Sequence, residues 1–340
     1  MIRIVGDCNF ADGYFDTGFG IGSAIQAGNV DPFVGLNISP TDYYIGNFEC
    51  VASSVSDKEG IQKKYFRITP NVLHNFRHLN LYGVANNHVM QHGANAYSEM
   101  LDTIENLGSA YVGSNNRRSY IFKHQDKQIA IIAFNQRPEN FSDTPSYWAL
   151  PDYKEIEAEL YKVRDADFRI IFVHWGNEFI EYPYNDQIQF AHFLIDCGAD
   201  LVAGMHPHVL QGMEVYNDKH IFYSLGNCLF RMAWRPTTYS IRINIDLATD
   251  VPIVSYDYIR IDADTSFPRI VSEVPEDYSI PVLSKKISLH RENELYYTHV
   301  ACRMSQYRKA NWRRFFRDIH RLRPAELCSI LKEFIQRRLS

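Results

Sequence analysis

The chain has 340 residues, and its 46% hydrophobic residues can bury the core of one large α/β domain with an appendage, or of two domains. No apolar run reaches the roughly 18 residues that a membrane-crossing helix needs, which excludes such a helix. Charge is uneven, because residues 285–340 hold 14 Lys and Arg against 5 Asp and Glu, so an acidic body carries a basic tail although the net charge is only −5.

The N-terminus and the cysteines indicate the cellular compartment. Residues 1–7 enter a strand directly and lack the basic, apolar and cleavage regions of a signal peptide. Six scattered cysteines form no Cys-x-x-Cys pair, which is typical of reduced thiols. We therefore expect a cytoplasmic protein. Cys8 and Cys50, each beside a carboxylate, are alternative soft metal ligands.

In the first part of the chain, strands and helices alternate and the apolar runs end in polar side chains. The expected strands cover residues 3–7, 42–49 and 81–88, and the expected helices cover residues 70–79 and 95–107. The strands end in Asp7, in Glu49 and in the triplet Asn86-Asn87-His88. Gly108 is the expected stop of the second helix.

The same alternation continues through the middle of the chain. The expected strands cover residues 129–134, 169–173 and 200–203, and the expected helices cover residues 153–163 and 187–197. His174 follows the second of these strands, and His206 and His208 follow the third. Two imidazoles at i and i+2 in extended backbone point the same way, and Pro207 between them stiffens that arrangement.

Five apolar runs thus end in residues that can ligate a metal. In α/β sheets, functional groups collect at the carboxyl ends of strands, so we expect these side chains to meet. If these residues served only in the core or in turns, we would not expect five successive apolar runs to end in potential metal ligands. Carboxylate, amide and imidazole ligands favour Mn, Zn or Fe over a thiolate-bound metal. We therefore predict a site for one or two divalent ions.

The pattern changes after residue 237. Residues 239–247 and 256–262 alternate with period two, which predicts half-exposed antiparallel strands. We expect them to complete a second sheet that packs on the first.

The basic tail reads as two amphipathic helices. One face of the first carries Trp312, Phe315, Phe316, Ile319 and Leu322, and arginines surround it. A second helix, starting near Pro324, carries Leu327, Ile330, Leu331, Phe334 and Ile335. The tail could dock on the body or on a sister subunit. It could instead bind anionic lipid at the inner membrane face or an anionic polymer. Nucleic acid is disfavoured because no recognised motif is present.

Several segments resemble a known family in order and spacing. They are GDCNF, GNFEC, VANNHVMQHG, FVHWGNEF and GADLVAGMHPHVLQGMEVYNDKHIFYSLGNCLF. They resemble the CapA family of bacterial capsule and poly-γ-glutamate synthesis proteins, which have a calcineurin-like metallophosphatase fold. The resemblance covers about residues 1–235 and leaves out the basic tail.

The charge and the amphipathic pattern of the tail separate a basic helical extension over residues 284–340 from a domain over residues 1–283. The resemblance implies an α/β fold for that domain, a four-layer α-β-β-α sandwich. It also implies site roles. Asp7 and His208 would bind a first metal, Glu49 would bridge both metals, and Asn87, His174 and His206 would bind the second. His88 would be the acid beside the site.

Other residues are secondary candidates. Asn86, Glu178 and Asn227 lie in the same motifs, while Lys64, Arg67 and Arg231 could hold an anionic substrate or be ordinary surface charges. Two features depart from the metallophosphatase pattern. The usual Asp-x-His is Asp7-Cys8-Asn9, so Asn9 would be a weaker ligand of the first metal. The usual bridging Asp is Glu49.

Three functions remain open. The first is a metal-dependent hydrolase that cleaves a phosphoester in capsule, exopolysaccharide or poly-γ-glutamate metabolism. The second is a non-catalytic, metal-containing protein that binds an anionic polymer or the capsule assembly machinery. The third is hydrolysis of an amide or glycosyl bond at the same centre.

Overall fold

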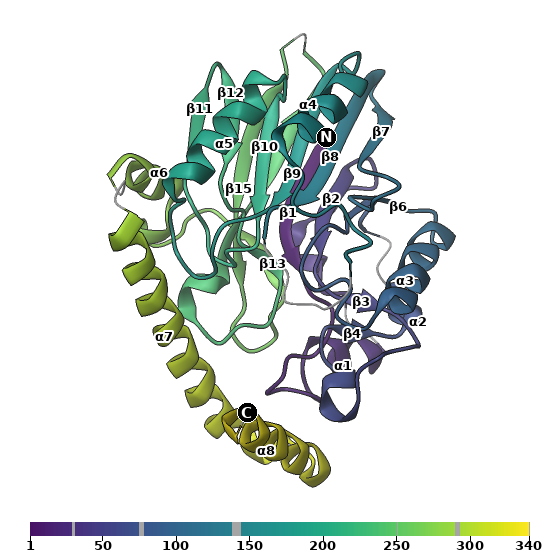
Figure 1. The fold of residues 1–340 in the computed structure, drawn as a ribbon, viewed down its shortest axis with the longest axis vertical. Helices are drawn as coiled ribbons and strands as arrows, with labels where there is room; N and C mark the ends of the chain where they lie inside the picture. Colours follow the sequence, from purple (N-terminus) through teal and green to yellow (C-terminus); the bar gives the residue numbers. More distant parts are fainter. Residues whose placement is uncertain (29–30, 75–77, 138–143, 250, 290–292, 340) are drawn as a thin grey trace.

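Two mixed sheets form the body of the protein (Figure 1). The computed structural model describes residues 1–28, 31–74, 78–137, 144–249, 251–289 and 293–339, without the side chains of residues 74, 289, 293 and 334–339. The first sheet has eight strands: β1 (Ile2–Cys8), β2 (Tyr43–Phe48), β5 (Leu81–Gly83), β6 (Ala110–Val112), β13 (Asn227–Leu229), β14 (Tyr239–Asp246), β15 (Ile253–Ile261) and β16 (Pro268–Val271). The second has six: β7 (Ser119–His124), β8 (Lys127–Asn135), β9 (Phe168–His174), β10 (Leu201–Met205), β11 (Met213–Tyr216) and β12 (Lys219–Phe222). A separate ribbon pairs β3 (Val51–Ala52) with β4 (Arg67–Ile68).

Helices cover the outer faces of the sheets and form the C-terminal extension. The α-helices are α1 (Ile21–Gln26), α2 (Pro70–His74), α3 (Ala94–Asn106), α4 (Tyr153–Lys162), α5 (Asn185–Asp196), α6 (Ile280–Leu289), α7 (Asn293–Asp318) and α8 (Pro324–Leu339). Short 3-10 turns are η1 (Val34–Leu36), η2 (Gly60–Lys63), η3 (Arg235–Thr238), η4 (Glu276–Tyr278) and η5 (Ile319–Arg321). The expected helix over 70–79 begins at Pro70, and residues 75–77 of it lie outside the described residues.

Three buried clusters separate four layers and confirm the α-β-β-α sandwich. Alternate side chains of the two sheets meet in the middle, for example Ile4 against Ile131 and Ile170. The opposite face of the first sheet packs on α3. The opposite face of the second packs on α4 and α5, whose apolar residues recur at helical spacing.

The strands after residue 237 contradict one expectation. β14 pairs antiparallel with β1, with Ile2 opposite Ile245, and β15 and β16 follow it. They therefore extend the sheet that contains β1 instead of completing a separate second sheet. Their alternation predicted strands correctly, but pairing with β1 joins residues about 240 positions apart, which a local pattern does not encode.

The strands at the centre of each sheet run parallel. In the first sheet β2 pairs parallel with β1 and with β5, and in the second β9 pairs parallel with β8 and with β10. The carboxyl ends of parallel strands lie at one edge of a sheet, where α/β proteins place functional groups. This topology positions the candidate site.

The C-terminal extension packs against the body. Phe315, Leu322 and Ile330 are buried at 3%, 8% and 2% exposure, in a cluster with Tyr65 of the body, whereas Phe316 is 66% exposed. α7 runs along one side of the sandwich and α8 lies at its far end, on the side of α1 (Figure 1). The side chains of Phe334 and Ile335 lie outside the described residues. Within the described residues, every helix is too short or too polar to span a bilayer.

Candidate metal centre

The chain delivers the candidate ligands from both sheets to one place. Asp7 lies near the end of β1, Glu49 directly follows β2, and His174 is the last residue of β9. The remaining candidates come from the loops after β5 and β10; they are the ligands Asn87, His206 and His208 and the acid His88. Most of these side chains are buried, and Asp7 and Glu49 are fully so.

The segment His206-Pro207-His208 does not have the extended backbone that was expected. His206 has φ of 97° and His208 has φ of 57°, so neither residue is extended, and β10 already ends at Met205. The prediction that both side chains point the same way from an extended strand is therefore wrong. The loop turns sharply around Pro207, yet both imidazoles still face Glu49. Left-handed backbone at non-glycine residues is costly and clusters at functional sites.

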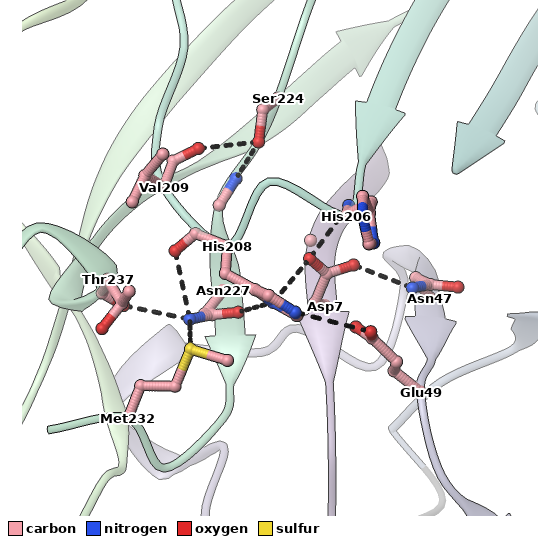
Figure 2. Close-up of polar contacts among 12 residues, drawn as sticks. Asp7, Asn47, Glu49, His206, His208, Val209, Ser224, Asn227, Met232 and Thr237 are labelled. Atoms are coloured by element: carbon pink, nitrogen blue, oxygen red, sulfur yellow. Dashed lines mark hydrogen bonds and ion pairs between the residues drawn. The ribbon is translucent and has the colours of Figure 1, made fainter. Parts of the chain in front are cut away.

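Asp7, His208 and Glu49 form one half of the centre (Figure 2). Nδ1 of His208 lies 3.3 Å from Oδ2 of Asp7, and its Nε2 lies 3.6 Å from Oε1 of Glu49. Asn227 fixes this imidazole, because its Oδ1 is 2.9 Å from His208 Nδ1 and its amide donates to the carbonyl oxygen of His208 at 3.3 Å. The close approach of β13 to β1 requires Gly6, where a Cβ would lie 1.8 Å from the carbonyl oxygen of Gly226.

Asn87, His174 and His206 form the other half. Nε2 of His174 lies 2.9 Å from Oδ1 of Asn87 and 3.0 Å from Nδ1 of His206. Nε2 of His206 is buried without a hydrogen-bond partner among the described residues. Three groups that can each donate a lone pair thus converge, as the ligands of an ion do.

Glu49 connects the two halves. Its Oε1 is 3.6 Å from Nε2 of His88, 4.0 Å from Nε2 of His174 and 3.6 Å from Nε2 of His208. Both carboxylate oxygens are buried without a hydrogen bond from any described residue. One ligand atom each from Glu49, His206 and His208 lie within 4.8 Å of one another. A buried carboxylate without donors is costly unless a cation compensates it, so the residues present fit a metal ion.

The protonation states agree with such a site. Burial raises the pKa of Glu49 well above its usual value, and the charge of Asp7 raises it further. Burial lowers the pKa of His174 to about 3 and that of His206 well below its usual value. Both imidazoles are therefore neutral at pH 7, which is the form that binds metals.

Asp7 and His208 form an ion pair instead. Burial alone would raise the pKa of Asp7, but the hydrogen bond and charge of His208 hold it below its usual value. Burial likewise opposes the charge on His208, yet Asp7 raises the pKa of this imidazole. The imidazole of His208 thus carries an extra proton, and a metal ion that binds this imidazole would displace that proton.

His88 lies at the wall of the cavity. Its ring stacks on Phe66 with centroids 3.8 Å apart, and its Nδ1 is 3.0 Å from Oε1 of Gln91. Burial lowers the pKa of His88 to about 4, so the ring is neutral at pH 7. The adjoining cavity of about 230 Å³ is also lined by Glu178 and Asn9.

Five of the secondary candidates already form hydrogen bonds or ion pairs with other residues of the chain. Asn9 uses its Oδ1 to accept the backbone N–H of Ala11 at 2.9 Å, and Asn86 donates to Oδ1 of Asn47 at 3.0 Å. Lys64 pairs with Glu326 at 3.1 Å. Two arginines are also engaged: Arg67 donates to the carbonyl oxygens of Lys63 and Ser53, and Arg231 pairs with Asp16 at 2.8 Å.

The cysteine alternative is disfavoured. Burial raises the pKa of the Cys8 thiol well above its usual value, and the neighbouring Cys228 raises it further. Burial also raises the pKa of Cys50. Among the described residues, the group of potential ligand atoms that lie within 4.8 Å of one another consists of Glu49, His206 and His208 and includes neither cysteine.

Sequence reasoning missed three contributors, which are Asn47 of β2 and Tyr307 and Arg314 of α7. Asn47 lies inside β2, where its amide donates to Asp7 Oδ1 at 2.8 Å and reaches Nδ1 of His174 at 3.3 Å. A polar side chain within a buried strand was the available signal. The extension contributes Tyr307, whose ring stacks on Phe179 at 4.0 Å, and Arg314. No local pattern links α7 to the other residues of this cavity, which end at Met232, 75 positions before Tyr307 (307 − 232).

A four-layer α-β-β-α sandwich therefore gathers these potential ligands at the ends of its strands. Residues 4–232 match the family described as bacterial capsule synthesis protein PGA_cap. The chain belongs to this family.

Named relatives and solved structures are similar to parts of the chain. A PGA biosynthesis protein CapA of Bacillus subtilis (strain 168) is 31% identical over 227 residues, covering 61% of this chain and 58% of that protein. A capsule biosynthesis protein CapA of Bacillus anthracis is 27% identical over 314 residues, covering 81% of this chain and 74% of that protein.

A phosphatase structure from Mycoplasma pneumoniae has 12% identity and a TM-score of 0.48, and the match covers 76% of this chain and 92% of the phosphatase chain. A 5'-nucleotidase structure from Candida albicans has 12% identity and a TM-score of 0.48, covering 91% and 57%.

Proposed function

We propose that the protein is a metal-dependent hydrolase that cleaves a phosphoester in the metabolism of a capsule polymer or poly-γ-glutamate. The observation that supports this most is Glu49, a fully buried carboxylate with no hydrogen-bond donor among the described residues. Imidazole nitrogens from both sheets surround it at 3.6–4.0 Å. A structural carboxylate would be expected to have donors, whereas a ligand of a cation needs none.

The proposed ligands form two sets, one for each of two ions. Asp7 and His208 would hold one ion, Asn87, His174 and His206 a second, with Glu49 between them. When bound, divalent ions polarise a phosphoryl oxygen and lower the pKa of water to near neutrality. Mn, Zn and Fe suit these oxygen and nitrogen ligands.

His88 is the proposed acid. Its neutral ring cannot donate the proton of an imidazolium before substrate binds. A phosphoryl dianion next to it would raise the pKa of His88, because a nearby opposite charge favours the cation. The ring could then protonate the leaving oxygen, with Gln91 and Phe66 holding its orientation.

One observation favours a non-catalytic alternative, a metal-containing protein that binds an anionic polymer or the capsule assembly machinery. Asn9 stands where metallophosphatases have a second imidazole, and its oxygen accepts the N–H of Ala11. The ion beside Asp7 would then have one strong ligand fewer and would be held less tightly.

The test measures metal and turnover on the same samples. Purified protein is assayed for bound metal by mass spectrometry, and for hydrolysis of generic phosphomonoesters and phosphodiesters with added Mn²⁺. We expect His174→Ala and His206→Ala each to lose both metal binding and turnover. Even outer-shell changes weaken metal sites by about 10–100-fold, and these are direct ligands.

His192→Ala is the matched control, because His192 pairs with Glu214 at 2.7 Å on the surface. It should keep both properties. Stoichiometric metal in the wild-type protein without turnover of any phosphoester would reject the proposed phosphoesterase.

A further inference from the structure

Helix α7 contributes three polar side chains to the wall of the cavity of about 230 Å³ beside the candidate ligands, which we call the metal cavity. Tyr307, Asn311 and Arg314 line it together with His88 and His208. Their spacing of four and then three residues places the three side chains on one face of the helix. Because the family match ends at residue 232, they are additional to the motifs that carry the candidate ligands.

Arg314 has buried donors that are not used within the protein. Its Nε and Nη2 form no hydrogen bond with any described residue. Among the described residues, Asp318 is the one carboxylate within 4.0 Å of this guanidinium, at 3.6 Å from Nε. The same carboxylate binds Arg317 more closely, at 2.9 and 3.0 Å. A buried charged donor without an acceptor is costly, so the arrangement favours an anion in the cavity.

A second guanidinium in the same wall strengthens this preference. Arg231 also lines the metal cavity, and it pairs with Asp16 at 2.8 Å. Burial lowers the pKa of Arg314, and the positive charge of Arg231 lowers it further, while Asp16 and Asp318 act in the opposite direction. Glu178 lines the cavity too, but within the described part of the chain it is not within 4.0 Å of either arginine. An incoming anion would therefore be attracted mainly by Arg314.

Packing holds Arg314 beside the cavity. Its neighbour Phe315 is 3% exposed and contacts Phe15, with ring centroids 4.9 Å apart. About two helical turns earlier, Tyr307 stacks on Phe179 at 4.0 Å. Phe15 and Phe179 belong to the body and line the same cavity. The guanidinium is thus held by a helix that is anchored on both sides of it, which reduces the cost of ordering it around a ligand.

We propose that Arg314 is a substrate-binding residue that donates hydrogen bonds from Nε and Nη2 to two phosphoryl oxygens of a phosphoester in the metal cavity. This assignment rests on the proposed function, because it takes the phosphoryl group of that substrate as the anion. Nε and Nη2 lie on one edge of the planar guanidinium, and such a fork matches two oxygens of a phosphate, which a lysine does not. The helical extension would then supply positive charge where negative charge is concentrated during phosphoryl transfer.

The experiment separates phosphate binding from turnover. The full chain is loaded with Mn²⁺, and calorimetry measures the Kd of inorganic phosphate for the wild type, Arg314→Gln and Arg314→Lys. Mass spectrometry measures bound metal in the same samples. The matched control is Arg317→Gln, which removes the same charge from the same helix and from the same Asp318 partner. Arg317 does not line the metal cavity.

We expect Arg314→Gln to keep its metal and to raise the Kd of phosphate about 10–100-fold, and Arg317→Gln to change it by less than about twofold. Arg314→Lys should have an intermediate Kd, because it keeps the charge and loses the forked donors. An unchanged Kd in Arg314→Gln, an equal loss in Arg317→Gln, or loss of metal from both Arg314 variants would overturn the proposal. Wild-type protein that holds Mn²⁺ and does not bind phosphate would overturn it as well.

Turnover supplies a second readout. In Arg314→Gln, kcat/KM should fall further for a phosphomonoester dianion than for a phosphodiester monoanion, because the Coulomb attraction to Arg314 is proportional to the charge of the substrate. An equal fall for both esters would indicate a structural role and overturn the proposal. Wild-type protein that binds phosphate through Arg314 and hydrolyses neither ester would reject the hydrolase alone. Unimpaired hydrolysis by Arg314→Gln would reject the role of Arg314 alone.

Discussion

The Glu49 carboxylate lies 3.6 Å from Nε2 of His208, and no described residue donates a hydrogen bond to either of its oxygens. Two elements from different sheets therefore bring a carboxylate and an imidazole together in a place closed to solvent. In the metal-free protein this arrangement disfavours a charged Glu49, and a cation would remove that cost.

The first prediction concerns Glu49. Its pKa in the folded protein is raised above the ordinary value of 4.5, so its stabilising contribution is complete below that value and is lost as pH rises through the folded pKa. Glu49→Gln should therefore raise the melting temperature of metal-stripped protein at neutral pH. With Mn²⁺ the order should reverse, because only the wild-type site gains stability from a tightly bound ion. Calorimetry with chelator and with Mn²⁺ checks both; a variant that melts below wild type in chelator contradicts the explanation.

The second prediction concerns acid stability at the edge of the first sheet. The carboxylate of Asp257 accepts hydrogen bonds from buried Arg242 at 2.5 and 3.2 Å and from Asn244 at 3.0 Å. Burial would raise the pKa of Asp257, but these donors hold it below 3.8. Its contribution is thus present above that value and is lost as pH falls through the folded pKa.

Asp257→Asn should lower the unfolding free energy at pH 7 by about 1–3 kcal/mol, because Arg242 loses a charged partner. The difference from wild type should shrink as the pH falls below 3.8 and through the folded pKa of Asp257. Urea titrations at pH 7 and across the acid range measure it. Asp246→Asn, at the end of the same strand pair, is the control and should change stability little. A difference independent of pH would show that the ion pair is not responsible.

The third prediction separates two adjacent rings on α7. Phe315 is 3% exposed and Phe316 is 66% exposed. Phe315→Ala should cost about 3–5 kcal/mol of packing between the extension and the body, and Phe316→Ala little. Limited trypsin digestion should then cleave the extension faster in the first variant alone. Equal cleavage rates in both would mean that the extension is held in another way.

The fourth prediction concerns lipid. Phe315, Leu322 and Ile330 are buried against the body, although Phe316 and Leu331 of the same expected apolar faces stay 66% and 46% exposed. Much of the apolar side of the extension is thus covered, and mainly its basic side remains available. We expect the chain to associate with anionic vesicles weakly and only at low salt, because screening removes an electrostatic attraction. Co-sedimentation at low and high ionic strength tests this. Salt-resistant association would indicate insertion of apolar side chains and would restore the amphipathic anchor.

The amino-acid sequence by itself determined the alternation of strands and helices, the ligand-bearing residue at each strand end, and the family. These features are local, because hydrophobic period and short motifs are written in neighbouring residues. The capping of α4, where Asp152 accepts the N–H of Glu155 at 2.8 Å, is of the same kind.

Only the tertiary structure decided which strands share a sheet and which side chains meet. β14 joins β1, His206 and His208 turn through left-handed backbone, and Arg314 reaches a cavity built from Asn9 onward. Each depends on contacts between distant residues, whose cost in chain entropy is repaid only when the whole core assembles. The grouping of ligands around Glu49 is therefore a property of the fold, although every residue in it can be picked out from the sequence.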